Sequence, residues 1–365
     1  MITLIIFSFC IAVLAVFVLV RRARHHARLY GTDMPQRFHV GDVPRLGGAG
    51  ILAGTVAAWL LAGFATEDPF YIGWSRLGAV VMIGCLLPAV IAGIVEDLTQ
   101  SVSARVRLLL TLSSAALFCW TWGLSIQRTD IGLLDQAIAA WPLLGILFAA
   151  FAIGGLPHAF NLIDGYNGLA GTVSLLTCLA ISHVALQCGD RQLAALVLSL
   201  AGATAGFLVF NYPRGKIFAG DGGAYVWGMV IAVTCVALVQ RHPQVSPWFP
   251  ILLLVYPVCE TLFSIYRKMA RGQSPGTADR LHFHQLIFRR LVRPVLLNDE
   301  DRQLLARNNK TAPYLWMFSA LSVVPAVMLW RNSLALAVCS LLFVSAYVGA
   351  YLTIVRFKVP GWLRF

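Results

Sequence analysis

Long runs of hydrophobic residues follow one another along this chain, separated by short polar connections. Many of the runs approach the roughly 20 residues that an α-helix needs to cross a bilayer. A segment inside the hydrocarbon must satisfy its own backbone hydrogen bonds, so each run predicts a transmembrane helix. The pattern therefore predicts an all-α, polytopic integral membrane protein with about eleven spans. The expected spans are residues 2–20, 46–66, 76–95, 105–125, 142–160, 169–187, 192–210, 222–240, 249–267, 312–330 and 333–355.

The composition agrees with this pattern. Hydrophobic residues make up 59% of the 365 residues, charged residues make up only 12%, and the mean hydropathy is +0.76. Soluble domains carry about 25% charged residues. No polar stretch is long enough for a separate soluble domain, so residues 1–365 are predicted to form one transmembrane domain. The longest polar connection, 268–311, is expected to be a cytoplasmic loop with short helices.

Basic residues are distributed unevenly between the two sets of connections. If the connections after the odd-numbered spans face the cytoplasm, that side holds 23 of the 28 Lys and Arg residues. By the positive-inside rule, the N-terminus then lies outside and the C-terminus lies in the cytoplasm. The first span lacks the basic start and the cleavage site of a signal peptide, so a retained anchor is expected. The net charge of +12 thus reflects topology and attraction to anionic membrane lipids, and it does not indicate nucleic-acid binding.

Five successive connections on the predicted cytoplasmic side carry nearly all of the candidate chemistry. Each holds carboxylates, amides, histidines or basic residues, most of them together with glycine. The connections on the other side are short and chemically plain. We therefore expect the five to fold together into one site at the cytoplasmic membrane surface. They read HVGDVPRLGGAG, VEDLTQSVSARVR, HAFNLIDGYNGLAG, FNYPRGKIFAGDGGAY and DRLHFHQLIFRR.

Acidic residues in two of these connections are candidates for phosphate chemistry and cation binding. Glu96 and Asp97 end a hydrophobic run, where adjacent acids repel each other and oppose the helix dipole, so a function explains them better than a solvated helix end. Asp221 lies between two glycines, which allow a ligand to approach the backbone closely. Lys216 is a candidate for phosphate, and Asp221 can bind a hard cation through oxygen. A glycine-rich helix start is the alternative for this stretch.

Asn161, Asp164 and Asn167 follow one another at intervals of three residues. Asp164 and the glycine after it are typical of an ordinary turn. The spacing is helical, however, and would direct three oxygen-bearing side chains toward one face. This arrangement favours a binding function over a turn alone.

Histidines and arginines complete the set of candidates. His282 and His284 flank a phenylalanine shortly after Arg280. Such a pair can bind zinc, but no third soft ligand is close in sequence, and phosphate contact or proton handling suits the neighbouring arginines better. A solvated basic loop is the alternative. His39 and Arg45, near a glycine pair, are candidates for substrate binding or for a turn at the membrane interface.

Taken together, these residues predict phosphoryl transfer at a membrane surface. Carboxylates for Mg²⁺ and Lys, Arg and His for phosphate oxygens suit that reaction, because positioning and charge neutralisation supply most of its catalysis. Eleven spans indicate that one reactant is a lipid. A transporter or lipid flippase is the alternative, but its polar groups would lie near the bilayer midplane. The main such residue here is Glu260, which is a candidate structural partner for a neighbouring helix or lining for a lipid groove.

In motif order and topology, the chain resembles the polyprenyl-phosphate N-acetylhexosamine-1-phosphate transferases, the glycosyltransferase 4-like WecA/MraY group of bacterial envelope enzymes. The resemblance covers roughly residues 35–295. It implies transfer of a sugar-1-phosphate from a UDP-N-acetylhexosamine to undecaprenyl phosphate, with release of UMP, at the start of O-antigen or other cell-envelope polysaccharide synthesis. It further implies Mg²⁺, or Mn²⁺ in its place, and an active site on the cytoplasmic face of the bacterial inner membrane. A homodimer is compatible with it.

Two features indicate which branch of this family the chain resembles. Eleven spans with a cytoplasmic C-terminus resemble the WecA branch, and HFHQ departs from the three consecutive histidines typical of the MraY branch. UDP-N-acetylglucosamine is the default donor, and UDP-linked deoxy-N-acetylhexosamines are the alternative. Glu96 and Asn167 stand where the family usually has aspartate, which also leaves open a catalytically inactive scaffold of the same fold.

The resemblance assigns roles residue by residue. Mg²⁺ on Asp221 is expected to bridge the donor pyrophosphate, and Phe218 matches a position that stacks on uracil. Asp97 is expected to orient the lipid phosphate or accept its proton. A lipid phosphate oxygen then attacks the sugar-bearing phosphorus, so the anomeric configuration is kept. The candidates are, for catalysis, Glu96, Asp97, Asp164, His282 and His284; for substrate binding, His39, Arg45, Asn161, Asn167, Lys216, Phe218 and Arg280; and for the metal, Asp97 and Asp221.

Overall fold

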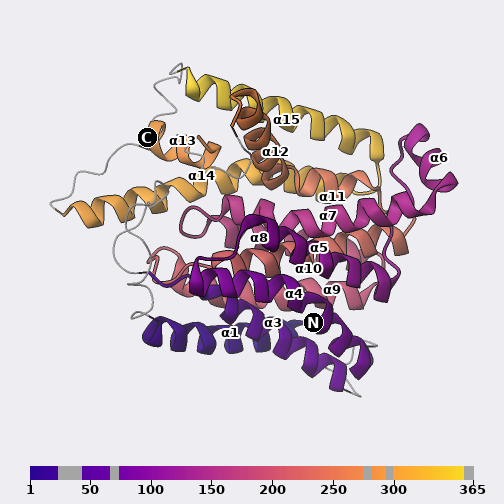
Figure 1. Ribbon diagram of the computed structural model, residues 1–365, viewed down its shortest axis with the longest axis horizontal. Helices are drawn as coiled ribbons and strands as arrows, with labels where there is room; N and C mark the ends of the chain where they lie inside the picture. Colours follow the sequence, from indigo (N-terminus) through magenta and orange to yellow (C-terminus); the bar gives the residue numbers. More distant parts are fainter. Residues whose placement is uncertain (24–42, 66–73, 274–280, 293–298, 357–365) are drawn as a thin grey trace.

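The computed structural model describes residues 1–23, 43–65, 74–273, 281–292 and 299–356 (Figure 1). His39 and Arg280, both predicted to bind substrate, lie outside these residues. Within the described ranges the chain forms helices and connections and no strand, which confirms the all-α prediction.

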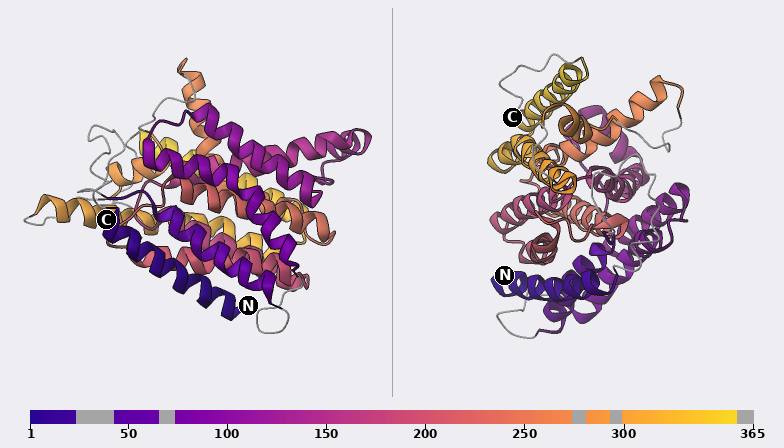
Figure 2. Two further views of the ribbon diagram at one scale, coloured as in Figure 1. Left: turned by 60° about the horizontal axis from the view of Figure 1, so that its bottom comes forward. Right: turned by 90° about the vertical axis from the view of Figure 1, so that its left-hand side faces the viewer.

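The described helices run side by side as one bundle, as Figure 2 shows from two further directions. Two short helices, α6 and α11, and the eight-residue α13 accompany the longer ones. The bounds are α1 Ile2–Arg22, α3 Gly47–Phe64, α4 Arg76–Thr99, α5 Ala104–Trp122, α6 Gly132–Ala140, α7 Pro142–Ile163, α8 Leu169–Gln187, α9 Arg191–Asn211, α10 Gly220–Arg241, α11 Trp248–Leu253, α12 Val255–Ala270, α13 Phe283–Arg290, α14 Glu300–Leu329 and α15 Ser333–Val355.

Each expected span corresponds to a helix, with differences at the ends. Nine of the described helices are long and apolar enough to cross a membrane; α5 and α12 fall outside this set. The ninth expected span, 249–267, is divided at Leu254 into α11 and α12. The helix α4 continues past the expected end at residue 95 and thereby places Glu96 and Asp97 in its last turn. The protein is thus a multi-pass membrane protein, while eleven spans and their orientation stay predictions.

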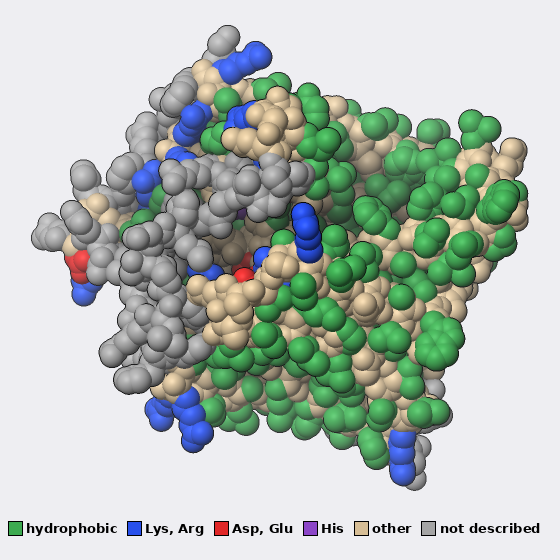
Figure 3. Space-filling view, viewed as in Figure 1, with side chains coloured by type: hydrophobic (Ala, Val, Ile, Leu, Met, Phe, Trp, Pro, Cys, Tyr) green, Lys and Arg blue, Asp and Glu red, His purple; other side chains and the backbone are tan. Residues whose placement is uncertain are grey.

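The centre of the bundle is α10, which is surrounded by α3, α4, α7 and α9. The most apolar stretch of α10 is 89% buried, against 22% for that of α1 and 28% for that of α15, which lie at the periphery. Glycines allow the central helices to approach closely: a Cβ atom on Gly228 of α10 would lie 2.3 Å from the Cα atom of Pro157 in α7. Hydrophobic side chains cover much of the face in Figure 3, as expected for helices in contact with lipid tails.

The two ends of the bundle differ in their chemistry. One end gathers the connections α4–α5, α7–α8 and α9–α10 with the start of α3, and most Lys and Arg side chains visible in Figure 3 lie toward it. The opposite end carries α6. There, Asp190 before α9 pairs with Arg241 and His242 at the end of α10. The candidate residues within the described ranges belong to the first end, which we call the site end.

Candidate active site

The first turn of α10 is the focus of the site end. The residues before and inside it read AGDGG, and Gly220 opens the helix with φ +71°, a conformation that side-chain-bearing residues rarely adopt. The first backbone N–H groups of a helix have no partner within the helix and carry the positive end of its dipole. This turn can therefore hold anionic groups that other helices bring to it.

Asp97 supplies the first of these anionic groups. Its Oδ1 accepts a hydrogen bond from the backbone N–H of Asp221 at 2.9 Å, and its Oδ2 accepts one from Gly222 at 2.8 Å. The residue is 4% exposed. The carboxylate thus lies where α4 ends and α10 begins and joins the two helices through charge-assisted hydrogen bonds. It is a structural cap for α10 as well as a candidate for chemistry.

Asp164 supplies the second acidic group. It follows directly after α7 and accepts a hydrogen bond from the backbone N–H of Gly220. Loss of hydration raises the pKa of this carboxyl group from its ordinary value to about 7, and the nearby Asp221 raises it too, whereas Arg45 and the Gly220 N–H lower it. Two acids, one in the last turn of α4 and one directly after α7, therefore accept hydrogen bonds from three consecutive N–H groups of one helix.

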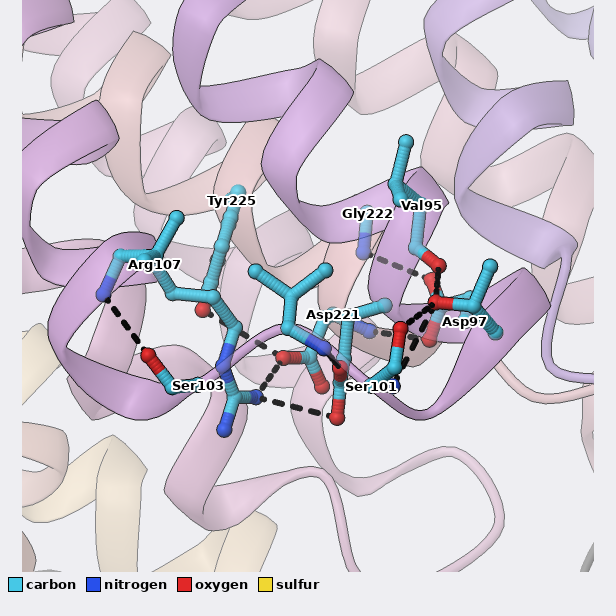
Figure 4. Close-up of polar contacts among 12 residues, drawn as sticks. Val95, Asp97, Ser101, Ser103, Arg107, Asp221, Gly222 and Tyr225 are labelled. Atoms are coloured by element: carbon cyan, nitrogen blue, oxygen red, sulfur yellow. Dashed lines mark hydrogen bonds and ion pairs between the residues drawn. The ribbon is translucent and has the colours of Figure 1, made fainter.

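Asp221 projects from the same turn toward α5, as Figure 4 shows. Its carboxylate forms an ion pair with Arg107 and accepts a hydrogen bond from the hydroxyl of Tyr225 at 3.3 Å. Arg107 also lies 3.8 Å from Glu96, whose other oxygen accepts the backbone N–H of Val102. Glu96 thus holds the α4–α5 connection and faces the same arginine as Asp221.

Close packing leaves no room for side chains at the glycines around this turn. A Cβ atom on Gly220 would lie 2.4 and 2.5 Å from the oxygens of Asp97, and one on Gly48 of α3 would lie 2.1 Å from the nitrogen of Gly223. A Cβ atom on Gly93 of α4 would lie 2.6 Å from the nitrogen of Gly222. The glycines thus permit α3 and α4 to contact the start of α10, and the sequence LGGAG has a packing role beyond an interface turn.

The segments before α3 and α10 are joined through their backbones. Phe218 donates its N–H to the carbonyl of Pro44 at 2.9 Å, and its own carbonyl accepts the N–H of Gly47 at 2.8 Å. This pairing brings Arg45 near Asp97 and Asp164. The ring of Phe218 is half-buried. The structure thus gathers Arg45 and the backbone of Phe218 at α10, while their contacts with substrate stay predictions.

The remaining residues of the predicted set are placed differently. Lys216 is exposed on the connection before α10. Asn161 lies in the last turn of α7, where its carbonyl accepts the N–H of Asp164. The helical spacing expected from Asn161 to Asn167 does not hold, because α7 ends at residue 163 and Gly168 has φ +74°. The three side chains therefore do not share one helical face.

Asn167 is directed toward α14. It is 1% exposed, its backbone N–H donates to Asn308 and its side-chain amide donates to Asn309 at 3.0 Å. Asn309 donates in turn to the carbonyl of Pro213, and Asn211 accepts the N–H of Gly168. These amides fasten α14 and the α9–α10 connection to the turn after α7. A contact between Asn167 and substrate stays a prediction.

His282 and His284 are both buried, at 6% and 2% exposed. Their Nδ1 atoms lie 3.3 and 4.0 Å from a carboxylate oxygen of Glu260 in α12. On its other side His284 reaches the turn after α7: its Nε2 lies 2.9 Å from where a Cβ atom would stand on Gly165, and its ring packs edge-to-face with Tyr166. The histidine motif therefore adjoins the residue that follows Asp164, in agreement with one convergent site.

The donor set of the first α10 turn suits a magnesium ion, but not a cage made by protein alone. Among the described residues, no three His, Cys, Asp or Glu side chains are arranged to hold a metal ion. Both oxygens of Asp97 bond to α10, whereas Asp221 faces outward toward Arg107. Mg²⁺ commonly binds one or two carboxylates and completes its shell with water and substrate phosphates. Asp221 fits that description best.

Sequence reasoning missed Arg107 and Tyr225. A signal for Arg107 was present, because an arginine in the first turns of a helix opposes the positive end of the dipole, as the acids at the end of α4 oppose the negative end. No comparable signal marks Tyr225, which lies one helical turn after Asp221 among buried residues.

Comparisons with known proteins indicate the family of the chain. Residues 79–239 match the family model described as glycosyl transferase family 4. The chain is 30% identical over 288 residues to a probable undecaprenyl-phosphate N-acetylglucosaminyl 1-phosphate transferase of Bacillus subtilis, covering 77% of this chain and 76% of that protein. It is 28% identical to a decaprenyl-phosphate N-acetylglucosaminephosphotransferase of Mycolicibacterium smegmatis over 67% of this chain and 65% of the relative. The corresponding undecaprenyl-phosphate enzyme of Escherichia coli K12 is 25% identical over 73% and 72%.

Fold and site together define a polytopic membrane protein whose acidic centre lies at one end of a helical bundle. The chain belongs to the glycosyl transferase family 4, within the polyprenyl-phosphate N-acetylhexosamine-1-phosphate transferases. This confirms the family indicated by the motifs.

Proposed function

We propose that this protein transfers N-acetylglucosamine-1-phosphate from UDP-N-acetylglucosamine to undecaprenyl phosphate and releases UMP. One observation carries the proposal: Asp97, Asp164 and Asp221, which are far apart in sequence, meet at the first turn of α10. The names of the relatives support the lipid acceptor and the N-acetylglucosamine group. A flippase is not favoured, because these polar groups lie at one end of the bundle.

Different residues of the site end would neutralise phosphate charge and position the lipid. Arg45 and Arg107 lie among the acids and can neutralise phosphate charge as the substrates enter. Lys216, exposed on the connection before α10, adds a further positive charge. Because a phosphate monoester is already largely ionised near pH 7, the lipid needs positioning more than deprotonation. Asp97 would contribute to that task through the neighbouring Arg45, because its own position is fixed by two hydrogen bonds and a carboxylate repels a phosphate that it meets directly.

Mg²⁺ is part of the proposal, with Mn²⁺ as a substitute. Asp221 would hold the ion, and the ion would supply charge neutralisation at the donor pyrophosphate. Arg107 would have to leave the carboxylate of Asp221 for this to occur. An oxygen of the undecaprenyl phosphate would attack the sugar-bearing phosphorus of the donor and form the new P–O bond, while the bond from that phosphorus to the oxygen of UMP breaks and UMP leaves. The bond between the sugar and its phosphate stays intact, so the anomeric configuration is kept.

The location follows from the same proposal. Basic residues concentrate at the connections of the site end, so the positive-inside rule places that end in the cytoplasm, where a nucleotide sugar is available. We propose the inner membrane of a bacterium, with the site on its cytoplasmic face.

One assay tests the proposal. Purified protein in detergent is mixed with undecaprenyl phosphate, MgCl₂ and, in separate reactions, UDP-N-acetylglucosamine and deoxy-N-acetylhexosamine analogues, and UMP release is measured. We expect turnover with UDP-N-acetylglucosamine, its loss in EDTA and its recovery with Mg²⁺ or Mn²⁺. Release of UMP only with a UDP-deoxy-N-acetylhexosamine would show that this sugar nucleotide, and not UDP-N-acetylglucosamine, is the donor. No release with any donor would overturn the proposal.

A further inference from the structure

The two carboxylate oxygens of Asp221 have different surroundings. Oδ2 holds two side-chain donors, Arg107 through an ion pair and Tyr225 through its hydroxyl at 3.3 Å. Among the residues that the structure describes, none donates a hydrogen bond to the other oxygen, Oδ1, and the side chain is 16% exposed. The described residues thus hold one oxygen and leave the other for a cation.

The two donors on Oδ2 differ in charge. Arg107 is a cation, so it competes with a metal ion for the same carboxylate. The hydroxyl of Tyr225 is neutral and can keep its hydrogen bond when a metal ion is bound. Tyr225 is fully buried and lies one helical turn after Asp221 in α10. Carboxylates that bind metals are commonly oriented by such an outer hydrogen-bond partner.

His158 in α7 holds the ring of this tyrosine. The two rings pack edge-to-face, with 5.2 Å between the centroids and 65° between the planes. On its other side, His158 Nε2 lies 3.0 Å from the hydroxyl oxygen of Thr111 in α5. Thr111 donates its hydroxyl hydrogen to the carbonyl of Leu108 at 2.9 Å, so its oxygen accepts from Nε2–H. His158 is therefore fixed by α5, one helical turn after Arg107, and supports a side chain of α10.

We propose that Tyr225 and His158 are positioning residues for the cation ligand Asp221. Tyr225 keeps its hydrogen bond to Oδ2 when Arg107 leaves, so the carboxylate has the same orientation before and after a cation binds. His158 holds the tyrosine ring in the position that this bond requires. The inference rests on the proposed function, because the cation is the one that the proposed reaction needs.

The alternative is that these two side chains only pack α7 against α10. A matched control for it is Tyr256 in α12, which is also fully buried and whose hydroxyl has no hydrogen-bond partner among the described residues. Tyr256→Phe thus removes a buried hydroxyl without touching Asp221. His158→Gln removes the ring beside Tyr225, while its side-chain amide can still donate to Thr111.

The first test measures Mn²⁺ binding to the detergent-solubilised protein by EPR, without substrates. Outer partners of metal ligands typically contribute about 10–100-fold to affinity. We expect Tyr225→Phe to weaken Mn²⁺ binding by at least about 10-fold, with a melting temperature close to that of Tyr256→Phe, which should bind Mn²⁺ like the wild type. Arg107→Gln removes the competing cation and should bind Mn²⁺ more tightly. Unchanged or tighter binding in Tyr225→Phe would overturn the inference, because the hydroxyl would then be dispensable or a competitor like Arg107.

The second test asks whether His158 acts through Tyr225. We expect His158→Gln to weaken Mn²⁺ binding by up to about 10-fold, the scale of an aromatic pair, and the double variant to bind Mn²⁺ as Tyr225→Phe does. No change in His158→Gln, or full additivity with Tyr225→Phe, would assign His158 to packing alone. If His158→Gln does not fold, Thr111→Val, which releases the ring without removing it, takes its place with the same outcomes.

UMP release separates this inference from the proposed function. Weaker Mn²⁺ binding in Tyr225→Phe together with no UMP release by the wild type would overturn the proposed function and still support the positioning of Asp221. Normal UMP release by a wild type that binds no Mn²⁺ at millimolar concentration would overturn this inference alone, because the carboxylate would not be prepared before the substrates enter.

Discussion

The carboxylate of Asp97 caps the helix that carries Asp221: its Oδ1 accepts the backbone N–H of Asp221 at 2.9 Å, and its Oδ2 accepts that of the next residue. The two acids are 124 residues apart in sequence. Their side chains therefore have different surroundings, since one is held by backbone donors and the other faces Arg107. Substitutions at the two positions should differ in their effect on stability while both reduce turnover.

We expect Asp97→Asn to abolish turnover and also to destabilise the protein. The asparagine amide would direct an N–H group at a backbone N–H, which loses one of the two hydrogen bonds and costs about 1–3 kcal/mol. Thermal unfolding in detergent and UMP release measure the two effects. Glu96→Gln, whose amide oxygen can still accept from Val102, serves as the comparison. Wild-type activity in Asp97→Asn would show that the Asp97 carboxylate has no role in catalysis.

Asp221→Ala should lower UMP release to below about 1% of wild type, because it removes charge stabilisation where phosphate charge is rearranged. Its side chain is partly exposed and contacts the side chains of Arg107 and Tyr225, so the melting temperature should change little. Asp130→Asn is the matched control at the opposite end of the bundle, where φ of +58° suits asparagine. Normal turnover in Asp221→Ala would exclude it as the cation ligand.

Two glycine-to-alanine substitutions distinguish the effect of close packing at the site from the effect of helix propensity on stability. Gly220→Ala forces a side chain into the left-handed region at about 1–2 kcal/mol, and its Cβ atom would meet the Asp97 oxygens. Turnover and melting temperature should both fall. Gly84→Ala in α4 meets no atom within 4 Å, so it should keep turnover and stabilise the helix by about 0.5–1 kcal/mol. Equal behaviour of the two variants would contradict the packing described for the first turn of α10.

The raised pKa of Asp164, about 7, predicts a dependence of stability on pH. Between the ordinary value near 4 and about 7, the native protein keeps this proton and the unfolded chain has lost it, so stability falls as pH rises through that window. Asp164→Asn should therefore match wild type near pH 4 and melt at a higher temperature above pH 7 without divalent cations. A wild-type melting temperature that rises relative to the variant between pH 4 and 7 would show the opposite sign.

Phe218→Ala should weaken binding of the UDP-sugar by roughly 1–3 kcal/mol, the usual contribution of a base stacked on an aromatic ring. The backbone of this residue is held by Pro44 and Gly47 and should not move. Isothermal titration with UDP-N-acetylglucosamine measures the change, and Phe218→Trp should retain affinity. Unchanged affinity in the alanine variant would mean that the ring does not contact uracil.

Much of the fold could be predicted because the bilayer imposes its length on every span. Hydrophobic runs gave the positions of helices such as α8, expected and observed at 169–187. Helix ends were less predictable. The break at Leu254 and the early start of α14 at residue 300 depend on neighbours that a single segment does not reveal.

The candidate site was predictable as a set of residues but not as a set of contacts. Charged and amide side chains next to apolar runs are costly unless they are used, and this identified Asp97, Asp164 and Asp221. The contact of Asp97 with Asp221 and the pair of Arg107 with Asp221 each link residues more than 100 positions apart. Likewise, Asn167 pairs with α14 and does not share one helical face with Asn161 and Asp164, as the spacing had predicted.

The sequence by itself determined that the protein lies in a membrane, where its helices lie, which residues form the polar site and which family it belongs to. Each of these follows from local hydrophobicity or from a short motif. Only the tertiary structure decided that Asp97 caps α10, that Arg107 faces Asp221 and that Glu260 lies behind the histidines. The physical reason is that a hydrogen bond or an ion pair forms over about 3–4 Å, and which distant groups come that close depends on how all the helices pack together.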